Sequence, residues 1–161
     1  MATAKKKKDA EDIVSICRNK RALHDYEIFE TLECGIVLKG TEVKSLREHA
    51  ASLEEAYAKI DAGELWLIGS DIPEYTMGNK LNHKPKRPRK LLLHKNEIDK
   101  FAGKASQQGY TLVPLRLYFK AGRAKVEIAV ARGKKTYDKR EVKKKAEAAR
   151  EIRKAMKDRR R

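Results

Sequence analysis

Hydrophobic, β-branched and aromatic residues gather in four stretches of the chain that have the character of β-strands. These stretches are 26–38, 64–72, 110–119 and 124–132. The first is interrupted at Gly35 and fits either one long bent strand or two short ones. In the last, Val and Ile occupy every second position and charged residues lie between them. Together with the turn at 120–123, this alternation predicts a half-buried antiparallel hairpin.

Two helices and one long loop are predicted between these strands. Residues 44–50 are typical of a short helix, for which Thr41 is a candidate cap. Residues 96–108 carry apolar side chains at helical spacing, and Gly109 is the expected stop. Residues 78–90 contain six Lys or Arg, no acid and two prolines, so we expect a loop there. Several short strands with an inserted helix favour a mainly β fold with short helices, closed as a small antiparallel barrel, over a βαβ sheet.

The end of the chain combines high charge with a helical pattern. Residues 133–161 contain 14 Lys and Arg against 5 Asp and Glu, and so hold +9 of the total net charge of +16. A pattern like a capping box precedes one narrow apolar stripe, formed by Val142, Ala146, Ala149, Ile152 and Met156. Because this stripe buries little and the lysines repel one another, we expect a coil in the free protein and a helix on a polyanion. A solvated helix or a disordered solubility tail is the alternative.

These features divide the chain into three parts: a basic disordered lead (1–12), a barrel body (13–132) and a basic tail that forms a conditional helix (133–161). The lead is basic, but no apolar run follows it, so we expect no export and a cytoplasmic location. Cys17 and Cys34 are then expected to be reduced thiols. No segment approaches the roughly 20 apolar residues of a membrane span.

The residues that could carry chemistry do not form a catalytic set. The four histidines lack the spacing of metal ligands, and no phosphate-binding glycine loop is present, so we expect no metal, no cofactor and no enzymatic activity. His24 and Asp25 could serve as a base with its orienting acid, but adjacent side chains do not usually face one another. A small nuclease that uses His24 or Glu54 is one alternative, and a permanent ribosomal protein is another.

The charge balance instead favours RNA as the partner. A sequence pI near 9.9 attracts phosphate, while an aromatic content of 6% is too low for an open stacking platform. We therefore expect recognition of RNA shape and backbone, with Tyr110 and Tyr118 packed in the core or at the barrel rim. A membrane surface is disfavoured because the stripe of the tail lacks Trp, Phe and Leu.

Five ordered segments of the chain resemble the SmpB family of SsrA-binding proteins. They are NKRALHDY (19–26), GTEVKSLR (40–47), RKLLLHKNEI (89–98), ARGKKTYDKR (131–140) and REIRKAMK (150–157). The resemblance implies an oligonucleotide-binding (OB-like) barrel with a long C-terminal tail. It also implies an RNA-binding adaptor that binds tmRNA (SsrA RNA), delivers it to stalled ribosomes and supports trans-translation. We expect such an adaptor to be a monomer in solution.

The resemblance further implies roles for individual residues. The tRNA-like domain of tmRNA would be contacted by Glu33, Leu92, His94 and Lys125. The tail would probe the small-subunit decoding centre and the empty messenger channel, through Gly133, Lys134, Lys135, Tyr137, Asp138, Lys139, Arg140, Ile152 and Met156. The chain departs from the family at His49, where glycine is usual. If that glycine serves a turn with positive φ, the local turn differs here.

Overall fold

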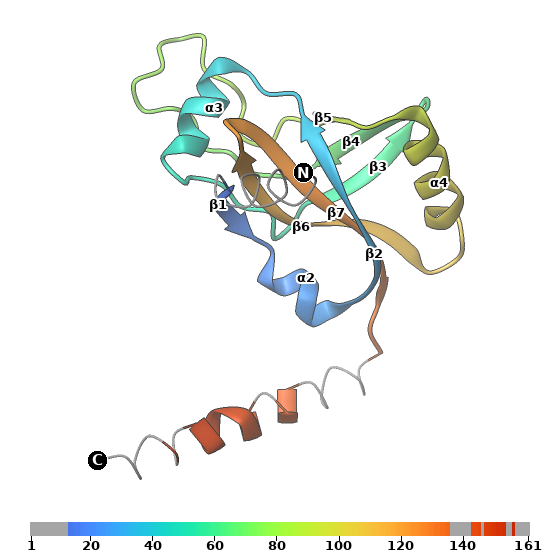
Figure 1. The fold of residues 1–161 in the computed structure, drawn as a ribbon. Coiled ribbons are helices and arrows are strands. Elements are labelled where there is room, and N and C mark those ends of the chain that lie inside the picture. The colour runs from blue at the N-terminus through green and yellow to red at the C-terminus, as the bar shows by residue number, and fades with distance from the viewer. Residues whose placement is uncertain (1–12, 136–142, 146, 154–155, 157–161) are drawn as a thin grey trace, which may run out of the picture.

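Seven strands and three helices form the body of the computed structural model, which describes residues 13–135, 143–145, 147–153 and 156 (Figure 1). The strands are β1 (Ile13–Arg18), β2 (Tyr26–Ile36), β3 (Tyr57–Asp61), β4 (Glu64–Ile68), β5 (Arg89–Leu92), β6 (Tyr110–Lys120) and β7 (Arg123–Gly133). The helices are α2 (Lys20–Asp25), α3 (Gly40–Arg47) and α4 (Lys95–Ala105).

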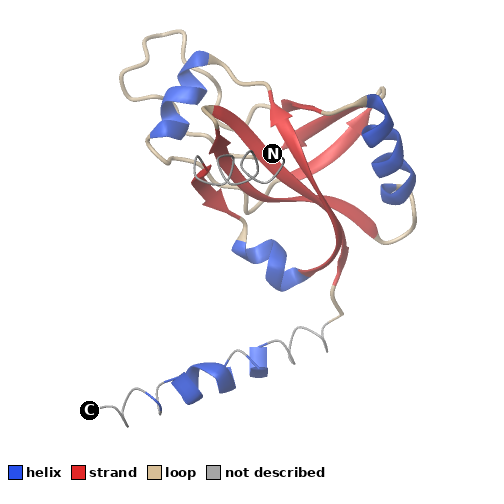
Figure 2. Ribbon diagram, viewed as in Figure 1, coloured by secondary structure: helices blue, strands red, loops and turns tan. Residues whose placement is uncertain are grey.

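The strands pair antiparallel and close the sheet on itself (Figure 2). Neighbouring strands follow the order β1-β6-β3-β4-β5-β2-β7, and β7 pairs again with β6. The sheet is therefore a ring, with β1 lying outside it against β6. The predicted mainly β fold with short helices is confirmed, and the ring is the closed antiparallel arrangement that the strand pattern favoured.

Apolar residues that alternate along the strands fill the interior of the ring. The most buried include Leu65, Leu67, Leu91, Leu117, Val126 and Ile128, each at most 1% exposed. Leu46 of α3 and Phe101 of α4 belong to the same core. Burial of each large apolar side chain contributes about 1.5–3 kcal/mol, so this core fixes the strands whose exposed residues are described below.

The long strand and the predicted hairpin agree with the sequence pattern. β2 is a single strand that passes through Gly35. The hairpin turns at Ala121 and Gly122, which have positive φ angles of 48° and 74°, as a tight turn between twisted strands requires. Pro114 lies at a register shift of β6 before Arg116. A bulge tolerates proline because its missing N–H breaks no regular ladder bond.

Other elements differ from the pattern. The sequence pattern did not reveal β1, β3 and α2, which are short or mostly half-exposed. The helix predicted at 44–50 begins at Gly40 with Lys39 as its N-cap, while the Thr41 hydroxyl instead bonds to His83. The loop predicted to end at 90 ends before Arg89, which starts β5. Arg89 is fully buried because Glu42 lies 2.9 Å from its Nε, a pairing that a basic run in the sequence does not reveal.

His49 occupies the left-handed region of backbone conformation, with a φ of 57°. Its N–H donates to the Leu46 carbonyl at 3.0 Å, and the N–H of Ala50 donates to Ser45, so these residues end α3 in a turn that suits glycine. The expected change in the turn is therefore not found. The backbone keeps a conformation that favours glycine, and the histidine is strained in it.

The described residues of the tail, 143–145, 147–153 and 156, have a helical backbone and are exposed. Ile152 and Met156 of the apolar stripe are 57% and 64% exposed. The helical pattern of the sequence is therefore present, although we expected a coil in the isolated chain; its dependence on a partner stays a prediction. The lead (1–12) and Tyr137, Asp138, Lys139 and Arg140 lie outside the described residues. No helix in the described part of the chain is long and apolar enough to cross a membrane.

Candidate nucleic-acid interface

Glu33, Leu92, His94 and Lys125 come from separate elements and line one pocket of about 400 Å³. Strand β2 brings them together, because Gly35 pairs with Leu92 of β5 on one side and with Lys125 of β7 on the other. A Cβ atom at Gly35 would meet the Leu92 Cβ at 3.2 Å, so glycine permits this close approach. The four residues predicted to contact RNA therefore share one site.

Three side chains surround the Glu33 carboxylate. The Tyr118 hydroxyl donates a hydrogen bond to it, Lys120 Nζ lies 3.2 Å from Oε2, and Lys125 Nζ lies 3.9 Å from Oε1. Partial burial raises the pKa of Glu33, but the hydrogen bonds from Tyr118 and Lys120 and the charges of both lysines outweigh this effect. The pKa of Glu33 therefore lies below its usual value, and the carboxylate is ionised at neutral pH.

The Glu33 carboxylate lies beside two cations, Lys125 in the lining of this pocket and Lys120 next to it. Glu97, the second carboxylate of the lining, accepts a hydrogen bond from the His94 N–H at 3.1 Å. The side chains of Glu33, Lys120 and Lys125 are 36%, 35% and 29% exposed, so a ligand can reach all three. An ionised carboxylate accepts hydrogen bonds but repels phosphate, whereas an ammonium group attracts phosphate. With Leu92 half-exposed beside them, these groups can bind a ribose or base donor next to a backbone phosphate.

A second hollow of about 430 Å³ adjoins this pocket and shares Gly35, Leu92 and Lys125 with it. Its other walls include Leu38, Val43 of α3, Phe119 of β6 and Arg123. Apolar walls with basic groups at the rim suit a base or ribose whose phosphate lies on the rim. The candidate interface thus extends from the pocket to the hairpin turn and to α3.

Sequence reasoning missed the two residues of β6 that hold Glu33. Tyr118 is 2% exposed, as expected for core or rim packing, but its hydroxyl also fixes the carboxylate. The hairpin register places Tyr118 opposite Lys125 and Lys120 opposite Arg123. This register follows from the predicted turn, whereas the approach of Glu33 depends on the pairing of β2 with β7, for which the sequence carries no local signal.

The start of the tail is attached to the body. Gly133 is the last residue of β7, so the strand extends one residue beyond the predicted boundary. The Lys134 N–H donates to the Asp25 carbonyl at 2.9 Å, and its ammonium donates to the Leu23 carbonyl at 3.0 Å. Lys135 is exposed. Ile152 and Met156 lie on the exposed helical part of the tail, and the structure does not place them near the pocket of Glu33.

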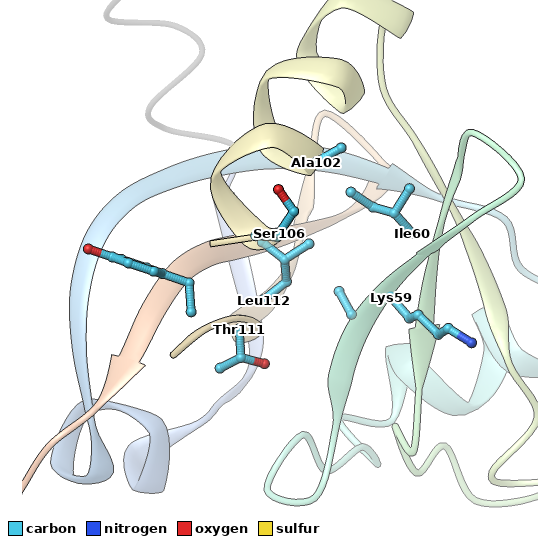
Figure 3. Close-up of a pocket in the computed structure, with 9 residues that line it drawn as sticks. Lys59, Ile60, Ala102, Ser106, Thr111 and Leu112 are labelled. Atoms are coloured by element: carbon cyan, nitrogen blue, oxygen red, sulfur yellow. The ribbon is translucent and has the colours of Figure 1, made fainter. Parts of the chain in front are cut away.

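Figure 3 shows another pocket, of about 420 Å³, which is lined by residues of α4, β3 and β6. Its labelled side chains are Lys59, Ile60, Ala102, Ser106, Thr111 and Leu112. None of its lining residues is a carboxylate or a histidine. This pocket therefore lacks an acid–base pair.

Reactive groups elsewhere are few. Within the part of the chain that the structure describes, no three His, Cys, Asp or Glu residues could hold a metal ion. His24 Nδ1 does lie 3.0 Å from Asp25 Oδ1, contrary to the expectation for adjacent residues, but the pair is exposed on α2. Burial raises the pKa of Cys17 to about 11 and that of Cys34 to about 12, which makes both poor nucleophiles at neutral pH.

Known proteins resemble this chain over most of its length. The sequence profile of the family described as "SmpB protein" matches residues 16–158. An SsrA-binding protein of Thermobifida fusca is 55% identical over 160 residues, covering 99% of this chain and 100% of the relative. An SsrA-binding protein of Desulforudis audaxviator is 56% identical over 141 residues, covering 88% and 92%.

A solved structure also resembles this chain. A chain from the structure described as "tmRNA-SmpB: a journey to the center of the bacterial ribosome" superposes with a TM-score of 0.64 and 51% sequence identity, covering 74% of this chain and 85% of that one. The segments noted in the sequence, the ring of strands and these relatives agree. The chain belongs to the SmpB family.

Proposed function

We propose that this protein binds tmRNA, delivers it to stalled ribosomes and supports trans-translation as a non-enzymatic RNA-binding adaptor of the cytoplasm. The relatives named SsrA-binding proteins and the tmRNA-SmpB structure support this function. The convergence of Glu33, Leu92, His94 and Lys125 on one pocket is the observation that carries it.

In this proposal the pocket grips the tRNA-like domain of tmRNA. Lys120 and Lys125 attract the phosphate backbone, Leu92 lies against a ribose or base, and Glu33 accepts a hydrogen bond from a base or ribose group. Because Glu33 also neutralises its lysines, it lowers their attraction for any RNA that lacks the matching donor. The carboxylate therefore contributes specificity more than affinity.

The tail supplies a second contact, to the ribosome. An emptied messenger channel admits a basic helix, whereas a channel occupied by message excludes it. Tyr137 would stack in the decoding centre, and Gly133, Lys134 and Lys135 would connect the body to the helix. The body and the tail thus have separate roles.

A substitution at Glu33 tests the pocket. Glu33→Gln removes the negative charge while it keeps the size and one acceptor oxygen. If Glu33 recognises a donor of tmRNA, the variant binds tmRNA less tightly and binds an unrelated structured RNA more tightly, because Lys120 and Lys125 are released. Equal gains for both RNAs, measured by filter binding at one salt concentration, would contradict the proposed role.

The RNA that co-purifies with the protein separates this function from its rivals. An adaptor co-purifies with tmRNA and is present in fewer copies than ribosomes. A permanent ribosomal protein is instead present at one copy in every ribosome. A nuclease instead degrades added RNA and loses this activity on substitution of His24 or Glu54. Recovery of ribosomes without enrichment of tmRNA would reject the adaptor.

A further inference from the structure

The two most exposed large apolar side chains of the described residues lie on one loop between β4 and β5. Met77 is 84% exposed and Leu81 is 92% exposed, whereas every other large apolar residue of the described body is at most 56% exposed. Single exposed apolar residues need no explanation, but two on the same short loop suggest a contact surface. We refer to residues 75–82 as the tip loop.

The tip loop has an internal scaffold. The Asn82 side chain donates to the Tyr75 carbonyl at 2.8 Å and accepts from the Tyr75 N–H at 3.3 Å. Gly78 lies against this clamp, since a Cβ atom there would meet Asn82 Nδ2 at 2.6 Å. The loop therefore presents Met77 and Leu81 from a fixed backbone, so little conformational entropy is lost when a partner covers them.

Buried polar groups attach the loop to the body. The His83 ring lies between the Thr41 hydroxyl and the Ile72 carbonyl, each at 2.9 Å. Beyond it, Arg87 and Arg89 both contact Glu42, with Nε to Oε1 distances of 2.8 and 2.9 Å. The segment that follows the tip loop is thus fixed to α3, through Thr41 and Glu42.

The charge around the tip loop favours RNA over a protein partner. Within 78–90 there are six Lys or Arg and no acid. Arg87 and Arg89 pair with Glu42, Lys86 with Glu55, and Lys90 with Glu64. For Lys80 and Lys84 the described residues supply no ion pair, so these two cations beside the apolar tip are available to phosphate.

The tip loop is continuous with the candidate interface. Val43 of α3 lines the hollow that adjoins the Glu33 pocket. The next residue, Lys44, places its ammonium 5.5 Å from the centre of the Tyr75 ring, at the base of the loop. Helix α3 therefore contributes to the hollow through Val43 and contacts the tip loop through Lys44, so it connects the two regions.

We propose that the tip loop is a second docking element for tmRNA, in which Met77 and Leu81 lie in the shallow minor groove of a helical segment and Lys80 and Lys84 contact its backbone. The A-form minor groove is wide enough to admit side chains and displays the riboses. This inference rests on the proposed function and adds a contact beyond the pocket of Glu33.

Two double variants separate the apolar and ionic parts of this contact. Met77→Ser with Leu81→Ser should weaken tmRNA binding about tenfold and leave the slope of log K against log salt unchanged, because no phosphate contact is lost. Lys80→Gln with Lys84→Gln should reduce the magnitude of this slope by roughly 1.4–1.8, the contribution of two phosphate contacts. Val14→Ser, at a half-exposed apolar residue on β1, is the control and should leave both quantities unchanged.

Hydroxyl-radical footprinting of tmRNA supplies a second readout. The unsubstituted protein should protect a patch of riboses in a helix that the variant with serines at 77 and 81 leaves unprotected, while protection by the Glu33 pocket persists. If this variant binds tmRNA like the unsubstituted protein, or loses only ribosome binding, the inference is overturned. If the unsubstituted protein itself fails to bind tmRNA, the proposed function fails instead.

Discussion

The body and the tail deal with positive charge in different ways. In the body, acidic residues hold basic ones in fixed positions: Glu33 contacts Lys120 and Lys125, and Glu30 contacts Lys100 and Lys104. The tail contains 14 Lys and Arg but only 5 Asp and Glu, and its described helical residues are exposed. The body therefore neutralises part of its charge internally, and we expect the tail to need a partner to do so.

This difference predicts two modes of binding. A pocket whose cations are already placed binds a structured RNA with little rearrangement. A tail with unneutralised charges gains most of its stability as a helix when phosphates surround it, so its binding reports whether an anionic channel is available. Substitutions should therefore affect the two regions separately.

Removal of the tail should give the largest functional effect. A chain that ends after Lys135 keeps the bonds of Lys134 to the body, and we expect it to bind tmRNA like the full chain. Tagging of peptides on ribosomes stalled at the end of a truncated message should be abolished, because the channel contact is lost. Tagging that persists without the tail would remove the channel from the proposed function.

Glu42→Gln should most strongly destabilise the body. Arg89 is fully buried against Glu42, and loss of one partner of a buried ion pair lowers the free energy of unfolding by about 3–5 kcal/mol. Glu55→Gln, in the exposed pair with Lys86, is the matched control and should have almost no effect. Urea unfolding at neutral pH measures both, and equal effects would show that burial does not distinguish the two pairs.

The same residue predicts how stability depends on pH. Burial raises the pKa of Glu42, but the hydrogen bonds from Arg87 and Lys39 and the charge of Arg89 outweigh this, so its pKa in the folded state is below the usual value. Its stabilisation is therefore complete above the unfolded pKa of about 4.3 and is lost as the pH falls through the folded pKa. Glu42→Gln should flatten this acid limb of the stability profile.

The sequence predicted those parts of the fold that depend on local patterns. The hairpin at 120–123 follows from alternation and a turn, and the strand through Gly35 follows from β-branched and aromatic residues. Closure of the ring depends on the pairing of distant strands, which has no local signal. Short or mostly half-exposed elements such as β3 therefore stayed undetected.

The same limit applies to the site. The resemblance named Glu33 and Lys125, but the pairing of β2 with β7 is what brings them together. The basic segment 78–90 shows the converse, since its prolines correctly predicted a loop over most of its length while its charge concealed the buried Arg89. Charge in a sequence does not show which basic residues are neutralised within the fold.

Lys125→Gln tests whether the body uses its placed cations on phosphate. We expect tmRNA binding to weaken about tenfold, or roughly 1.4 kcal/mol, and the salt slope to fall by roughly 0.7–0.9 for one lost phosphate contact. Lys59→Gln, on β3, is a control that should change neither. A weaker affinity with an unchanged slope would show that Lys125 acts by holding Glu33 rather than by contacting phosphate.

Glycine substitutions give the smallest effect and compare the two regions directly. His49→Gly should raise the free energy of unfolding by about 1 kcal/mol, since only glycine adopts a φ of 57° without strain. For a body of this size (residues 13–132) this corresponds to a rise in Tm of about 3–5 °C. Glu48→Gly, one residue earlier at a φ of −82°, relieves no strain and should lower Tm instead.

The matching change in the tail is Ala149→Gly. It weakens the helix by about 1 kcal/mol, yet it should leave Tm unchanged, because the unfolding of the body does not include the tail. Tagging should decline while tmRNA binding persists. A fall in Tm would instead show that the body stabilises the tail helix. The positive charge of the tail would then not depend on a partner alone, and the contrast with the body, whose acidic residues neutralise its own lysines, would no longer hold.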